Sequence, residues 1–171
     1  MKEIIEIAQY TIPSLITGIV AYYFFLNHTK SEERKIKLQL LRETKKEILP
    51  LKLQAYERMT LFLERMNLSN LILRIPSVNN DKSAYATGLI NTIEQEFEHN
   101  LAQQIYISAK CWNIIVTAKN ATIGIVKKNE LNADIATAQD LKESILKAMI
   151  SSEPPSHTAL GVLKEEVKDL L

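Results

Sequence analysis

The stretch TIPSLITGIVAYYFFLNHTKSEERKIK, residues 11–37, joins an uncharged, aromatic-rich run directly to a charged one. No charged side chain occurs in residues 7–26. A helix rises about 1.5 Å per residue, so this run covers roughly the 30 Å hydrocarbon core of a bilayer. We therefore expect residues 1–27 to form one N-terminal transmembrane helix.

The ends of the run support this interpretation. Tyr10 lies near one end and Tyr22 and Tyr23 near the other, and rings with a polar tip favour membrane interfaces. A proline in the first half can kink a spanning helix or limit its regular start. The predicted span is represented by Ile7, Pro13, Ile16, Tyr22, Tyr23 and Leu26.

A cleaved signal peptide and a buried core helix are the alternatives to a membrane span. A signal peptide needs a basic start and a small-residue cleavage site, whereas here Lys2 is offset by Glu3 and Glu6 and the run ends in bulky YYFFLNH. A buried helix of a soluble bundle stays open, because polar side chains make the run only moderately apolar. These are Gln9, Thr11, Ser14 and Thr17.

The charges that flank the run predict its orientation. Residues 28–47 carry the basic side chains Lys30, Arg34, Lys35, Lys37, Arg42, Lys45 and Lys46. Only Lys2 and the chain terminus precede the run. The positive-inside rule then places the C-terminal domain in the cytoplasm of a single-pass inner-membrane protein. Acidic residues alternate with the basic ones, so residues 28–49 are predicted to be a charged juxtamembrane helix and not a lipid-binding polybasic segment.

Composition excludes several classes of protein. The 171 residues carry a net charge of +1, which argues against a nucleic-acid binder. The single cysteine, Cys111, cannot form an internal disulfide. With four glycines and five prolines, the chain favours helices over a sandwich of strands.

Apolar residues after the run recur at three- and four-residue steps, which predicts an all-α bundle of about four to five helices in residues 50–152. Pro50 should start or kink the first of them. Residues 67–83 are expected to break the helical pattern, with a loop at Pro76, Asn79, Asn80 and Asp81. Asp81 or Ser83, Ser108 and Asn132 are expected to cap helices. Residues 153–171 are predicted to be a linker and an amphipathic helix capped by Thr158. The core should bring together Phe62, Phe97, Leu101 and Trp112.

The chain offers little catalytic chemistry. Glu96 and His99 have the Glu-x-x-His spacing that di-iron bundles use twice, but no second copy occurs. They are weak candidates for a metal site, and a solvated helix face is the favoured interpretation. No nucleophile and base can be paired and no phosphate-binding loop is present, so we nominate no catalytic residue and no cofactor.

A polar strip follows one side of the helix expected after Pro50. Glu-Arg-Met occurs at residues 57–59 and again at 64–66, seven residues apart, which stacks like residues on one face. The strip comprises Gln54, Glu57, Arg58, Glu64 and Arg65. We interpret it as a partner-binding edge, with a solvated surface as the alternative.

Two segments carry a family resemblance. LPLKLQAYERMTLFLERM at residues 49–66 and EFEHNLAQQIYISAKCW at residues 96–112 resemble a family of uncharacterised membrane-anchored helical proteins from Bacteroidetes-type bacteria. The resemblance reaches to about residue 130 and implies no known activity, cofactor or catalytic residue.

We therefore expect a membrane-anchored interaction module, scaffold or accessory subunit of an inner-membrane complex. Its partners would be membrane lipid and either another protein or further copies of itself. The alternatives are a metal-dependent enzyme that uses Glu96 and His99, or a soluble helical subunit whose first helix packs into a partner.

Overall fold

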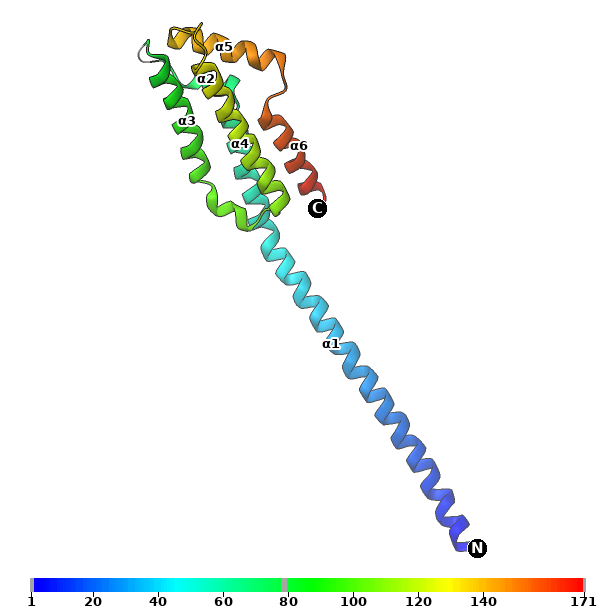
Figure 1. The fold of residues 1–171 in the computed structure, drawn as a ribbon. Coiled ribbons are helices and arrows are strands. Elements are labelled where there is room, and N and C mark those ends of the chain that lie inside the picture. Colours follow the sequence, from blue (N-terminus) through cyan, green and yellow to red (C-terminus); the bar gives the residue numbers. More distant parts are fainter. Residues whose placement is uncertain (1, 78–79, 171) are drawn as a thin grey trace. The chain divides into compact units, whose positions relative to one another are not determined.

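The computed structural model describes residues 2–77 and 80–170, and the side chains of residues 2–12, 14 and 31 lie outside that description. Every regular element in the described residues is helical, which confirms the all-α class (Figure 1). The elements are α1 (Lys2–Arg65), α2 (Leu68–Arg74), α3 (Lys82–Glu98), the 3₁₀ helix η1 (Leu101–Ile105), α4 (Ala109–Glu130), α5 (Ala138–Ser151) and α6 (Pro155–Lys168). The chain divides into two compact units, Met1–Leu49 and Pro50–Leu171.

Helix α1 includes Pro50, where we expected a helix start or a kink. Proline has no N–H, so the carbonyl four residues earlier loses its usual helical partner. Pro50 is exposed, and water can therefore satisfy that carbonyl.

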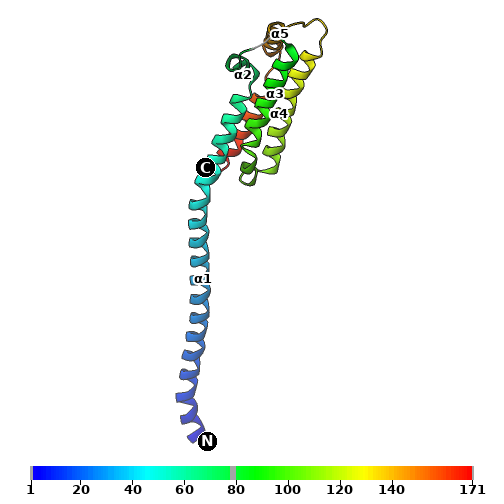
Figure 2. The same ribbon diagram turned by 90° about the vertical axis from the view of Figure 1, so that its left-hand side faces the viewer.

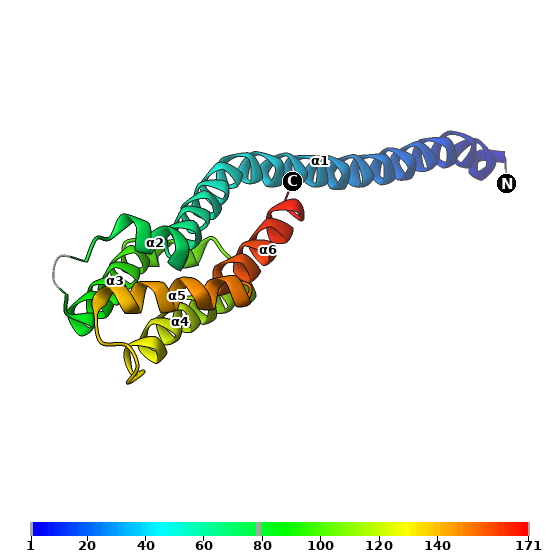
Figure 3. The same cartoon turned by 90° about the horizontal axis from the view of Figure 1, so that it is seen from above.

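The core of the second unit is built around α4. This helix packs against α3, α5 and α6, and α5 also packs against α2 and α3. Figure 2 shows α3 and α4 side by side, and Figure 3 looks onto α5, which packs against both of them. The C-terminal part of α1 contributes Met59, Phe62 and Leu63, and Met66 follows the helix directly; each is no more than 1% exposed. Burying one such side chain contributes about 1.5–3 kcal/mol, so this stripe fixes residues 50–65 in the unit.

Local capping defines where several helices begin. The Asp81 carboxylate accepts hydrogen bonds from the backbone N–H groups of Ser83 and Ala84, and Ser108 Oγ accepts one from Cys111 N–H. These are two of the predicted caps. They satisfy N–H groups that have no partner inside the helix.

Two predicted starts were wrong. α5 begins after Thr137 and not after Asn132, because Thr137 and Asp140 form a reciprocal capping box. α6 begins at Pro155, whereas we expected Thr158 to cap it. Proline suits the first turn of a helix, where its missing N–H costs nothing.

The region between α1 and α4 also differs from the expectation. Part of the stretch expected to break the helical pattern forms α2, capped by Asn67, because Leu68, Leu71 and Ile72 are buried in the core. Of the residues expected to form the loop, Asn79 lies outside the described residues. α3 ends at Glu98, and residues 101–105 form the separate 3₁₀ helix η1.

The predicted aromatic core is confirmed in part. The Phe97 ring centroid lies 5.5 Å from that of Phe62 and 5.4 Å from that of Trp112. Leu101 is 40% exposed, so its assignment to the core was wrong. It lies in the 3₁₀ helix η1, whose three residues per turn do not keep the three- and four-residue steps of an α-helix on one face.

Candidate functional site

The five residues of the polar strip, Gln54, Glu57, Arg58, Glu64 and Arg65, are all exposed. They lie on α1, on the side away from the buried Ala55, Met59 and Phe62. Leu61 lies among them and is 59% exposed. Leu61 was not predicted to belong to the strip, although the steps from Gln54 to Arg58 to Leu61 to Arg65 place all four on one helical face. Arginine, which the strip contains twice, is enriched at protein interfaces.

An open groove of about 450 Å³ borders the strip at Glu57. Its wall is mostly apolar and comes from two elements, α1 and α6. The lining residues are Leu53, Tyr56, Glu57, Thr60, Leu163, Lys164, Val167 and Lys168. The strip therefore lies beside a groove. The sequence did not predict this groove, because half of its lining comes from α6, which is distant from α1 in the sequence.

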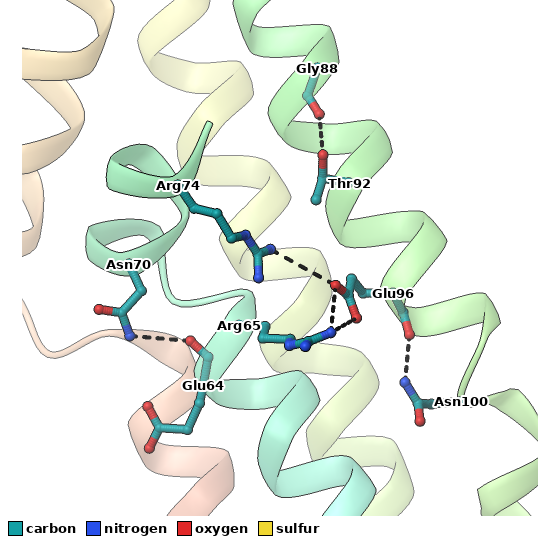
Figure 4. Close-up of polar contacts among 8 residues, drawn as sticks. All are labelled: Glu64, Arg65, Asn70, Arg74, Gly88, Thr92, Glu96 and Asn100. Atoms are coloured by element: carbon teal, nitrogen blue, oxygen red, sulfur yellow. Dashed lines mark hydrogen bonds and ion pairs between the residues drawn. The ribbon is translucent and has the colours of Figure 1, made fainter. Parts of the chain in front are cut away.

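Arg65 is held by an ion pair within the unit (Figure 4). Its Nη1 lies 3.1 Å and 3.2 Å from the two carboxylate oxygens of Glu96, and Arg74 Nη2 lies 4.0 Å from Oε1 of the same residue. The Glu96 side chain is 24% exposed and those of Arg65 and Arg74 are 54% and 41% exposed. An ion pair with this much solvent exposure contributes at most about 1 kcal/mol to the free energy of unfolding.

The same cluster joins the ends of three helices. Arg65 and Arg74 lie in the last turns of α1 and α2, where a cation interacts favourably with the helix dipole. Asn70 Nδ2 donates to the Glu64 carbonyl at 3.3 Å, and Asn100 Nδ2 donates to the Glu96 carbonyl at 2.7 Å (Figure 4). These carbonyls lack helical partners, so the cluster acts as a set of C-terminal caps.

The structure places Glu96 and His99 in surroundings that do not favour a metal. Two guanidinium groups already neutralise the Glu96 carboxylate, and a cation would have to compete with them. His99 is the exposed C-cap residue of α3. Within residues 2–77 and 80–170, no three His, Cys, Asp or Glu side chains are grouped so that they could hold a metal ion.

A second polar cluster links α6 to α4 and to α1. The Glu166 carboxylate accepts hydrogen bonds from Ser108 Oγ at 2.6 Å, from Ser108 N–H at 3.0 Å and from the Tyr56 hydroxyl. Burial alone would raise the pKa of Glu166, but the hydrogen bonds from Ser108 and Tyr56 hold it below its ordinary value. No sequence signal marks this cluster, since Tyr56, Ser108 and Glu166 come from three distant segments.

Cys111 is fully buried next to this cluster. Desolvation, followed by the nearby Glu166 charge, raises the pKa of its thiol to about 12. The thiol is therefore protonated at neutral pH and acts as a small core side chain.

In the first unit, the predicted span leaves its apolar side chains uncovered. Ile16, Tyr22 and Tyr23 are 56%, 67% and 68% exposed, Leu26 is 39% exposed, and Pro13 is exposed. The side chain of Ile7 lies outside the described residues. Among the described residues, no helix combines the length and the apolar character that are needed to cross a bilayer.

Residues 2–170 match the model of the DUF7935 family, a family of unknown function, and the chain belongs to that family. No curated protein and no solved structure matches the chain.

Proposed function

We propose that this protein is a helical interaction module, a scaffold or accessory subunit, that is held at the inner membrane by the N-terminal part of α1. Its second unit would use the polar strip to bind a protein partner on the cytoplasmic side. The observation that carries the proposal is the exposed face of α1 at Arg58 and Leu61, opposite a fully buried face of the same helix.

The proposed anchor is supported by the distribution of exposed apolar side chains. Val20, Tyr22, Tyr23, Phe24 and Phe25 are each more than 60% exposed. At about 100° per residue, these side chains point to all sides of the helix. A helix that is apolar all round is normally surrounded by lipid or by protein, because water solvates it poorly.

The proposed partner surface is supported by the lack of intramolecular contacts of its central side chains among the described residues. Arg58 and Glu57 take part in no ion pair or side-chain hydrogen bond among the described residues, and Leu61 does not enter the core. Arg65 contributes less, because Glu96 already holds it. The double change Arg58→Ala with Leu61→Ala therefore tests the strip more cleanly than a change at Arg65.

The matched control is Lys147→Ala with Ile150→Ala on α5. It also combines an exposed cation with an exposed aliphatic residue three positions later, and Ile150 is 87% exposed. Proteins co-purifying with each full-length variant from native membranes would be quantified against wild type. We expect the strip variant to lose partners at least about tenfold, since a truncated interface contact of this kind costs about 2 kcal/mol or more. Both variants should keep their stability within about 0.5 kcal/mol.

Equal retention of every partner by both variants would contradict the partner surface.

The anchor is tested separately by washing membranes with carbonate and then with detergent, and release by carbonate alone would contradict it. For the orientation, a phosphatase reporter fused after Leu171 should be inactive and a cytoplasmic reporter active. The reverse result would place the second unit on the other side.

A further inference from the structure

Two faces of α1 in residues 33–48 carry opposite charge. The acidic face comprises Glu33, Ile36, Leu40, Glu43 and Glu47, and the basic face comprises Arg34, Leu38, Leu41, Lys45 and Ile48. Within each face the residues follow one another at steps of three or four, so each face is a stripe along one side of the helix. At about 100° per residue the centres of the two faces lie roughly 140° apart around the helix axis.

Among the described residues of the first unit, neither face has apolar cover or a counter-charge, although Gln39 Nε2 donates a hydrogen bond to Glu43 Oε1 at 3.4 Å. The apolar members Ile36, Leu38, Leu40, Leu41 and Ile48 are 41–58% exposed. The ion pair formed by described residues of this unit joins Lys35 to Glu32, and neither belongs to the two faces. Glu43 and Glu47 are four residues apart, a spacing at which like charges destabilise a helix. Each face therefore lacks both apolar cover and counter-charge.

The charged and apolar residues of the two faces occur in the same order and at similar heights along the helix axis, so they can pair between two helices. When two parallel copies of the helix are set side by side, Glu33 meets Arg34, Ile36 meets Leu38 and Leu40 meets Leu41. Glu43 then meets Lys45, and only Glu47 meets an apolar residue, Ile48. An antiparallel arrangement would set Glu33 against Ile48 and Ile36 against Lys45.

We propose that the occupant of these faces is a second copy of this chain, with the acidic face of one α1 packed against the basic face of a parallel neighbour. A contact between identical faces would place glutamate against glutamate or cation against cation. The interface is therefore heterologous: it joins two different faces and is not two-fold symmetric. Such a contact leaves one acidic and one basic face free at the ends of a pair. The assembly therefore contains three or more chains. This inference does not depend on the polar strip of the second unit.

Cysteine cross-linking in the full-length chain tests the pairing of faces. Leu40→Cys and Leu41→Cys are expressed separately and together, and membranes are treated with an oxidant. We expect cross-linked chains only when both variants are present, because Leu40 of one copy lies against Leu41 of the next. The native Cys111 is fully buried and gives a low background. Cross-linking of either variant alone would show an identical-face contact and overturn the proposal.

The control pair for chance collisions is Gln39→Cys with Arg42→Cys, at the same level of α1 but between the two faces. It should cross-link at least about fivefold less than the Leu40 and Leu41 pair. Equal cross-linking of the two pairs, or none for either, would also overturn the proposal.

A charge exchange tests the ionic contact independently. Lys45→Glu sets like charges against Glu43 of the neighbour and should reduce the detergent-purified chain to single 19.5 kDa copies, whereas wild type measures three or more by light scattering. Adding Glu43→Lys should restore the assembly. Residues two apart do not face each other on one helix, so the rescue can act only between chains. Failure of the rescue, or assembly of Lys45→Glu alone, would refute the interface.

The assembly state of the Arg58→Ala with Leu61→Ala variant distinguishes this inference from the proposed function. It should retain three or more copies even where it loses other partners. Emission of Trp112, the single tryptophan, verifies that the second unit of each variant is folded. A strip variant that dissociates while folded would show that the chains assemble through the strip and not through residues 33–48.

Discussion

Replacing Glu166 with glutamine should loosen the attachment of α6 to the N-terminus of α4. The carboxylate accepts three hydrogen bonds, two from Ser108 and one from Tyr56, and it lies at the positive end of the α4 dipole. Glutamine keeps one acceptor oxygen and loses the charge. A hydrogen bond to a charged group contributes about 1.5–3 kcal/mol, but the site is half-buried and the Ser108 hydroxyl can accept from the new amide. We therefore expect a loss of about 1–3 kcal/mol.

Urea unfolding followed by Trp112 emission measures this loss, because the ring lies on α4 against Phe97. Glu165→Gln is the matched control: Glu165 is the preceding residue, is exposed and pairs only with Lys168 among the described residues. It should change the free energy of unfolding by less than about 0.5 kcal/mol. Equal effects of the two substitutions, or a Glu166→Gln loss below about 0.5 kcal/mol, would refute the assigned role.

The pH dependence gives a second test of the same residue. The pKa of Glu166 is lower in the folded state than its ordinary value of 4.5, so its contribution is present above that value. The contribution is lost as the pH falls through the lowered pKa. The stability difference between wild type and Glu166→Gln should therefore shrink below about pH 4.5. The lowered pKa of Asp140 acts equally in both proteins and cancels from this difference. A difference that does not change with pH would argue against the carboxylate as the cause.

Three further predictions follow from the packing and from the proposed anchor. Phe97→Ala should cost about 2–4 kcal/mol in the same urea assay, because the ring touches Phe62 and Trp112 but is only half-buried; a loss below about 1 kcal/mol would contradict this packing. Cys111 should react with a maleimide at pH 8 only on unfolding, since it is buried and its pKa is raised to about 12, and rapid labelling of the folded chain would contradict that environment. Ile16→Arg should reduce the carbonate-resistant membrane fraction, because a central charge costs about 2.5–3.5 kcal/mol on insertion; an unchanged fraction would contradict a span at this position.

The sequence by itself determined the features that depend on neighbours along the chain. The three- and four-residue steps of apolar residues predicted helices and the burial of Phe62, because a helix brings positions at those steps to one side. Asp81 and Ser108 were recognised as caps because a cap bonds to N–H groups only two or three residues away. The same local logic identified the exposed strip, although it overlooked Leu61.

Tertiary structure decided what distant segments do to one another. α2 forms where the helical pattern was expected to break, because the core covers Leu68, Leu71 and Ile72, and that burial offsets its weak local signal. Glu96 became an ion-pair partner only when α3 was brought beside the ends of α1 and α2, and Glu166 became the partner of Ser108 only when α6 packed on α4. Such contacts depend on how helices pack, and no spacing along the chain encodes the pairing of residues 58 or 110 positions apart.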